Sequence, residues 1–149
     1  MTVKAIVGKI NKVNKNNRLY TYNAIKNAIK DFQEANESVY LYPSFNDKDP
    51  SMLDIMGVLQ KLYLEGDELC AEISILPSKE ALFSFLYNTN NVIVANFSGS
   101  LDLKNNNLIV DSCQIDDLTF TADPSWDCCN LTIKESDNSE FWDIIKFYF

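Results

Sequence analysis

The central stretch Ile55–Leu76 reads IMGVLQKLYLEGDELCAEISIL. Two apolar-rich runs, Ile55–Leu64 and Glu68–Leu76, lie on either side of Glu65-Gly66-Asp67. Strand-like runs separated by a short segment with a glycine are typical of a β-hairpin. The middle of the chain is therefore predicted to form antiparallel sheet.

On each side of this hairpin, apolar residues recur at the spacing of an α-helix. The segment Tyr22–Ala35 is predicted to be a helix with Thr21 as its N-cap. A second helix is expected to open at Pro77, with Ser78 as its cap. The first helix is expected to bury Ala24, Ile25, Ala28, Ile29 and Phe32, and the second Ala81, Leu82, Phe85 and Leu86.

Short apolar runs elsewhere predict further strands. They are Val3–Ile10, Val39–Leu41, Val92–Ala95, Leu101–Leu103, Leu108–Val110 and Cys113–Phe120. The order is therefore strand, helix, several strands, helix and more strands. This order favours an α+β fold, an antiparallel or mixed β-barrel with two or three surrounding helices, over a doubly wound sheet.

The chain of 149 residues, 46% hydrophobic and 23% charged, has the size and composition of one globular domain. We assign residues 1–126 to the barrel and 127–149 to a C-terminal aromatic tail. The tail is expected to pack on its own domain or to anchor in a partner. Its candidate partner contacts are Phe141, Trp142, Ile145, Phe147 and Phe149.

Several classes of protein are disfavoured by what the sequence lacks. No run of 18 apolar residues suggests a membrane span, and the first residues do not resemble a signal peptide. The chain contains no histidine, which excludes Ser-His-Asp and Cys-His catalytic arrangements. No metal or cofactor motif is present, so neither is expected. The four cysteines are expected to be reduced and mostly buried: Cys70, Cys113, Cys128 and Cys129.

Charge is distributed unevenly along the chain. The formal net charge is −8, yet residues 1–30 carry seven cations and no acid. Such a basic edge can meet an acidic partner or the protein's own acidic surface. The acidic remainder argues against nucleic acid as the partner. The cations that we expect to contact a partner are Lys9, Lys12, Lys15 and Arg18.

Three segments, in order, resemble the prohead (head-maturation) proteases of tailed bacteriophages, which share their fold with herpesvirus assembly proteases. The first, Gly8–Ile10 with Asn14–Tyr20, is similar to an "N-x-N-G-R-x-Y-P" opening. The second, Gly57–Leu76, resembles paired strands that end in "a-x-I-L". The third consists of Val92–Ser100, Val110-Asp111 and Asp123-Pro124-Ser125, similar to the nucleophile strand, "V-x-D" and "D-P-S". The resemblance implies a protease-like barrel.

The chain departs from this family where the family keeps its chemistry. The resemblance places Tyr42, before Pro43, at the catalytic histidine position. It places Ala95 or Asn96 at the position of the nucleophilic serine. Ser98 and Ser100 lie nearby but offset, and a lysine such as Lys79 or Lys104 would have to serve as their base.

These departures lead us to expect no enzyme. The leading hypothesis is a non-catalytic virion structural protein of a tailed phage, a capsid-associated auxiliary or minor head protein. Its partners would be the major capsid protein or other virion proteins, with self-association as a further option. It would occur in the virion, and in the host cytoplasm during assembly. The alternatives are an atypical prohead peptidase that uses Ser98 or Ser100 and a host-directed binding protein.

Overall fold

A computed structural model describes residues 1–44, 52–104 and 107–133. Its elements in chain order are β1 (Thr2–Lys9), β2 (Arg18–Tyr20), α1 (Tyr22–Glu34), β3 (Tyr40–Tyr42), the 3-10 turn η1 (Met52–Asp54), β4 (Gly57–Glu65), β5 (Glu68–Ile75), the 3-10 turn η2 (Pro77–Lys79), α2 (Glu80–Asn88), β6 (Val92–Lys104), β7 (Asn107–Thr121) and β8 (Asn130–Ile133). No helix among these residues is long and apolar enough to cross a membrane.

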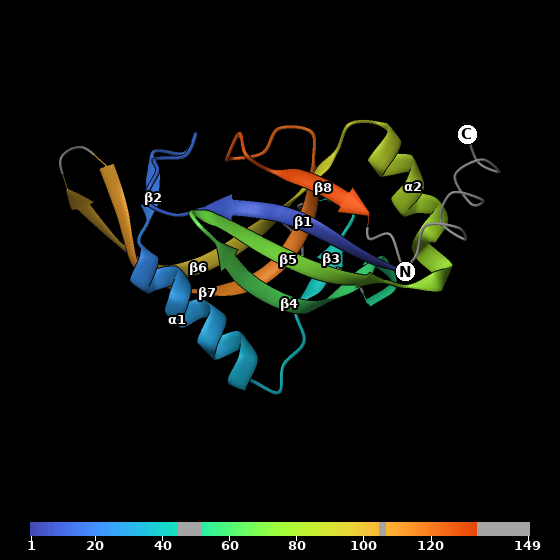
Figure 1. The fold of residues 1–149 in the computed structure, drawn as a ribbon, viewed down its shortest axis with the longest axis horizontal. Coiled ribbons are helices and arrows are strands. Elements are labelled where there is room, and N and C mark those ends of the chain that lie inside the picture. Colours follow the sequence, from blue (N-terminus) through green and yellow to red (C-terminus); the bar gives the residue numbers. More distant parts are fainter. Residues whose placement is uncertain (45–51, 105–106, 134–149) are drawn as a thin grey trace.

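The described strands form one curved, mostly antiparallel sheet with two helices (Figure 1), which confirms the predicted α+β class. Its order is β2-β7-β3-β4-β5-β1-β8, and β6 pairs with β7. Only the pairs that β2 and β3 make with β7 are parallel among the described strands. The sheet curls so that β6 contacts β1 and β8 across the core.

The predicted central hairpin is confirmed as β4 and β5. Glu65 pairs with Glu68, and Gly66 adopts a φ of +59° between them. This left-handed conformation is open to glycine at little cost. The hairpin then pairs with β1 through β5, which places three antiparallel strands side by side.

The first helix also forms where it was predicted, with Ala24, Ile25 and Ala28 buried, whereas Ile29 and Phe32 at the rim of the core are half-buried. The Thr21 hydroxyl oxygen accepts a hydrogen bond from the Ala24 N–H at 3.1 Å, which satisfies a free donor of the first turn. Helix α1 contacts both β7 and β4. Since β3 between those strands is only three residues long, α1 covers the part of the core that β3 leaves open.

The prediction for the second helix is wrong in its cap and in part of its buried face. Ser78 lies inside η2, and α2 begins two residues later with Lys79 as a cap that makes no side-chain hydrogen bond. The face of α2 that packs on the sheet carries Phe83, whose ring lies edge-to-face against Phe120 of β7, so Phe83 is buried while Leu82 and Phe85 are exposed. Ala81 and Leu86 are half-buried.

The last part of the sheet is more continuous than predicted. Val92–Ala95 and Leu101–Leu103 belong to one strand, β6, and Leu108–Val110 and Cys113–Phe120 to another, β7. Two register shifts, between Asn96 and Phe97 and between Ser100 and Leu101, let the long pair bend without ending.

Residues after Trp126 include a strand that the sequence analysis did not predict. Strand β8, within the segment assigned to the tail, pairs with β1. Trp126 itself is buried, with its ring 5.3 Å from that of Tyr20. The tail residues proposed as partner contacts lie outside the described residues: Phe141, Trp142, Ile145, Phe147 and Phe149.

Candidate functional site

The two positions at which the resemblance implies chemistry lie on the strands that flank β7. Tyr42 of β3 is in register with Thr119 of β7. Asn96 of β6 is in register with Asp117 of β7. Thr119 and Asp117 are two residues apart on one strand, so their side chains share a face of the sheet. The fold therefore brings Tyr42 and Asn96 to the two sides of one polar row.

Hydrogen bonds identify Asn96, and not Ala95, as the residue that belongs to this row. The Asn96 side-chain amide donates to Asp117 Oδ1 at 2.7 Å and to Thr119 Oγ1 at 3.0 Å. Ala95 is 5% exposed and lies in register with buried Leu118. Because neighbours on a strand face opposite sides, Ala95 belongs to the core and Asn96 to the polar face. We call Tyr42, Asn96, Asp117 and Thr119 the polar row.

The polar row offers hydrogen-bonding groups with limited reactivity. Burial, followed by the negative charge of Asp117, raises the pKa of the Tyr42 phenol, which remains protonated at neutral pH. Asn96 contributes an amide, which has neither a basic nor a nucleophilic group. The Thr119 side chain is only 3% exposed and already accepts a hydrogen bond from Asn96. The row is well suited to joining β6 to β7.

The fallback serine Ser98 has a different partner. Its hydroxyl donates to Asp116 Oδ1 at 3.0 Å, and the Gln114 amide approaches the same oxygen at 3.4 Å. In the strand register Ser98 is paired with Gln114, and the shift after Asn96 leaves Asp116 without a partner on β6, within hydrogen-bonding distance of Ser98. A carboxylate is a weak general base at neutral pH, since its reference pKa is about 4. Ser100 lies further along the strand, in register with Ser112.

The lysines considered as a base for these serines do not join them in the described structure. Ser98 is hydrogen-bonded to an acid. Lys79 lies in η2, the turn before α2. The Lys104 side chain lies outside the described part.

All four thiols are free, as predicted, and Cys70, Cys113 and Cys129 are buried while Cys128 is half-buried. Burial raises the pKa of Cys113 to about 11 and that of Cys129 to about 12. Burial also raises the pKa of Cys70 and Cys128. The reactive thiolate is therefore disfavoured at every one of these positions.

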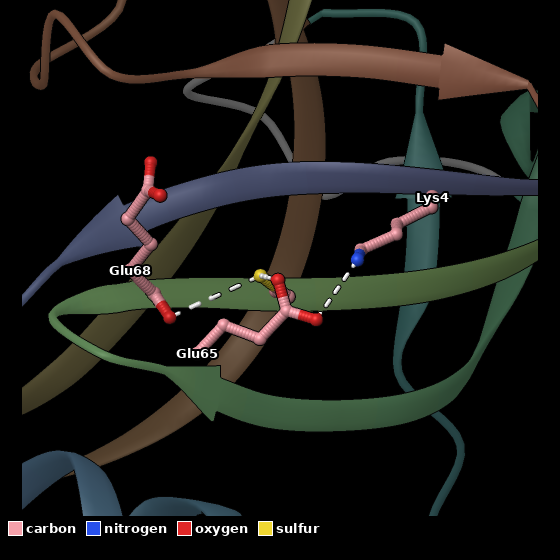
Figure 2. Close-up of polar contacts among 4 residues, drawn as sticks. Lys4, Glu65 and Glu68 are labelled. Atoms are coloured by element: carbon pink, nitrogen blue, oxygen red, sulfur yellow. Dashed lines mark hydrogen bonds and ion pairs between the residues drawn. The ribbon is translucent and has the colours of Figure 1, made fainter.

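Cys70 belongs to a contact among β1, β4 and β5 (Figure 2). Lys4 Nζ lies 3.0 Å from Glu65 Oε1, and that hydrogen bond raises the pKa of Lys4. The Cys70 thiol is 3.8 Å from Glu65 Oε2 and 3.9 Å from the Glu68 carbonyl oxygen. Lys4, one of the cations of the basic N-terminal segment, is thus paired with Glu65 of the same protein.

The candidate basic contacts divide between two places. A cavity of about 210 Å³ is lined by Lys9, Lys12 and Lys15 together with Trp126. Lys15 is already paired with Asp123 at 2.8 Å. Arg18 lies elsewhere, at a cavity of about 270 Å³ that also contains Tyr20, Phe97 and Ser98.

The loop that carries these cations is fixed by short polar contacts. Asn14 Oδ1 accepts from the backbone N–H groups of Asn16 and Arg18, at 2.9 and 3.1 Å. Asn11 and Asn17 adopt positive φ values of 59° and 60°. Asparagine tolerates this region better than most residues, which explains its abundance in the loop. Lys15 N–H donates to the Ser125 carbonyl oxygen at 3.0 Å, which joins the loop to the segment before Trp126.

The described residues hold no group of three or more histidine, cysteine or acidic side chains that could bind a metal ion. Of the acids near one another in the sequence, Asp116, Asp117 and Asp123 each contact a different partner. Sequence reasoning did not single out Thr119 or the role of Asp117. Alternation within β7 places them on one face, but only the strand register shows that Asn96 meets them.

The comparison with solved structures shows the fold. The bacteriophage T4 capsid assembly protease, gp21, matches with a TM-score of 0.65 over 79% of this chain and 80% of its own. The two chains share a fold. Their identity is 15%, and a likeness at this level concerns the fold alone. No protein-family model and no curated protein sequence matches the chain. The prohead-protease-like fold implied by the three sequence segments is therefore supported by structure.

Proposed function

We propose that this protein is a non-catalytic, capsid-associated structural protein of a tailed phage, an auxiliary or minor head protein on a degenerate prohead-protease-like fold. The observation that carries the proposal is the polar row. Asn96 and Tyr42 stand where the resemblance places serine and histidine, and Asn96 is engaged with Asp117 and Thr119. A phenol and an amide cannot replace a nucleophile and its base.

The likeness to a capsid assembly protease supports a role in the phage head. A protease of that kind must contact the proteins of the immature shell. Loss of its chemistry would leave those contacts as the property that selection can keep. The protein would then act by adhesion to the major capsid protein or to another virion protein, within the virion and in the host cytoplasm during assembly.

Deletion of the gene from the phage that encodes it tests this proposal. We expect capsid assembly or infectivity to fall, and a copy that carries Ser98→Ala to restore both fully. Normal assembly and infectivity without the gene would contradict the proposal. The matched control is the wild-type copy supplied in the same way.

A second candidate, an atypical peptidase, has one observation in its favour. The Ser98 hydroxyl is hydrogen-bonded to a carboxylate at 3.0 Å on the exposed side of the β6–β7 pair. Under this alternative, Ser98→Ala would abolish cleavage of head proteins, whereas Ser100→Ala would leave it intact. Unchanged processing with Ser98→Ala removes the best version of the alternative.

A further inference from the structure

Three strand segments form an extension that we call the arm. It consists of β2, Leu101–Lys104 of β6 and Asn107–Val110 of β7. Figure 1 shows the paired ends of β6 and β7 reaching past β1 at the left of the view, with β2 beside them. The register aligns Arg18 with Leu108 and Leu103, and aligns Tyr20 with Val110 and Leu101.

One face of the arm is apolar and partly uncovered. Because side chains alternate along a strand, Leu101 and Leu103 of β6 share a face with Leu108 and Val110 of β7. Leu101 is 43% exposed and Leu103 is 71% exposed. Exposed apolar side chains that gather on one face mark interaction sites more often than isolated ones do.

Arg18, the only arginine of the chain, lies on this same face. It lines the cavity of about 270 Å³ with Tyr20, Phe97 and Leu101. Its Nε is buried without an acceptor, its guanidinium interacts with the Tyr20 phenol, and the side chain forms no ion pair with any described residue. A guanidinium in a partly buried cavity of mixed lining binds a carboxylate through charge-assisted hydrogen bonds that are partly shielded from water.

The outer edge of β6 adds a third feature. Within the described part of the chain, β6 pairs with β7 alone, so its other edge has no strand partner. Such an edge presents backbone donors and acceptors to an extended segment. Strand β6 carries Leu101 and Leu103 and also lines the Arg18 cavity, whereas Arg18 itself lies on β2, on the far side of β7. A segment bound at this edge therefore lies beside the two leucines, and a long side chain that crosses the face can reach the cavity.

We propose that the arm binds an extended segment of a partner protein in which apolar side chains and a carboxylate occupy alternate positions and so share one face. The apolar side chains pack on Leu101 and Leu103, and the carboxylate accepts hydrogen bonds from Arg18. The cavity is smaller than most small-molecule sites, which measure about 300–1,000 Å³, and suits one or two side chains. The inference deepens the proposed function and rests on it in assigning the segment to a virion protein.

A peptide titration of the isolated full chain tests the inference. The probes are the capped peptides acetyl-Val-Thr-Glu-Thr-Val-amide and acetyl-Val-Thr-Gln-Thr-Val-amide, in which the first, third and fifth side chains share a face when the peptide is extended. Binding is followed by NMR at the leucine methyl groups and the Arg18 Nε–H. We expect saturable shifts at Leu101, Leu103 and Arg18. The glutamate peptide should bind about fivefold more tightly, as one charge-assisted hydrogen bond of about 1 kcal/mol would give.

Two variants separate the contributions. Arg18→Gln should abolish the preference for glutamate over glutamine, which a purely structural role of Arg18 would not do. Leu103→Ser should lower the affinity for both peptides. Lys26→Gln on α1 is the charge-matched control and should leave both affinities unchanged. Equal affinity for the two peptides, no saturable shift, or shifts confined to exposed Leu82 and Phe85 would overturn the inference. Those outcomes leave the proposed function standing, since it is judged from phage assembly.

Discussion

Asn96 and Asp117 are joined by a 2.7 Å hydrogen bond between β6 and β7, immediately before the register between these strands shifts. The same Asn96 amide reaches the buried Thr119 hydroxyl at 3.0 Å. In an active protease of this fold, the resemblance would place a nucleophile at this position. Here the side chain at this position joins two strands to each other.

Removal of the Asn96 amide should therefore cost stability. Asn96→Ala leaves Asp117 and Thr119 without their donor, and we expect the free energy of unfolding to fall by about 1–2 kcal/mol in urea titrations. A double-mutant cycle with Asp117→Ala should show a coupling of about 1 kcal/mol. Gln114→Ala, at an exposed and longer contact, should stay within about 0.5 kcal/mol of wild type. Equal effects at Asn96 and Gln114 would contradict this role.

The orientation of α2 is tested by two phenylalanines on the same helix. Phe83 is fully buried, with its ring edge-to-face against Phe120 at 5.8 Å, whereas Phe85 is 53% exposed. Phe83→Ala should lower the free energy of unfolding by about 3–5 kcal/mol, and Phe85→Ala by about 1 kcal/mol or less. A larger loss of unfolding free energy with Phe85→Ala than with Phe83→Ala would contradict this orientation and would support the buried face predicted from the sequence.

Gly99 permits the close approach of β6 and β7 at the base of the arm. A Cβ atom there would lie 2.1 Å from the Ser112 carbonyl oxygen and 2.7 Å from Cys113 Cα, both backbone atoms. We expect Gly99→Ala to destabilise the protein by about 3 kcal/mol, as overpacking does. Gly66→Ala is the control, because its site is open and only the positive φ opposes it, at about 1 kcal/mol. A lower stability of Gly66→Ala than of Gly99→Ala, in thermal or urea unfolding, would contradict this expectation.

Asp123 should titrate abnormally because Lys15 pairs with it. The hydrogen bond from Lys15 lowers the pKa of Asp123 and raises the pKa of Lys15. A carboxyl with a depressed pKa in the folded state stabilises the protein above its unfolded pKa of about 4, and this contribution is lost as the pH falls through the folded value. An NMR titration should show the Asp123 carboxyl returning to its ordinary pKa in Lys15→Gln. No change would mean that the ion pair is not formed in solution.

The elements that sequence analysis predicted correctly are those with local signals. The Glu65-Gly66-Asp67 turn and the Thr21 cap each depend on a few consecutive residues. The cap of α2 was missed because a 3-10 turn over Pro77–Lys79 precedes the helix. Its buried face was missed because it is set by packing of Phe83 on Phe120 of β7, a contact that helical spacing does not specify.

The candidate site, too, could be predicted only as far as local sequence signals reach. The positions of Tyr42 and Asn96 follow from the order of the motifs, but the choice between Ala95 and Asn96 needs the register of β6 on β7. A one-residue slip exchanges the two faces of a strand. The arm depends on the parallel pairing of β2 with β7, a contact between residues about 90 apart that no local pattern specifies.

The central claim, the proposed structural role in the head of a tailed phage, is tested most directly by quantitative mass spectrometry of purified mature phage particles. The copy number and the intactness of the chain are measured against the major capsid protein. The account predicts many intact copies in each particle. Absence from the particle, or trace amounts present only as self-cleaved fragments, would contradict it and would favour the host-directed or peptidase alternative.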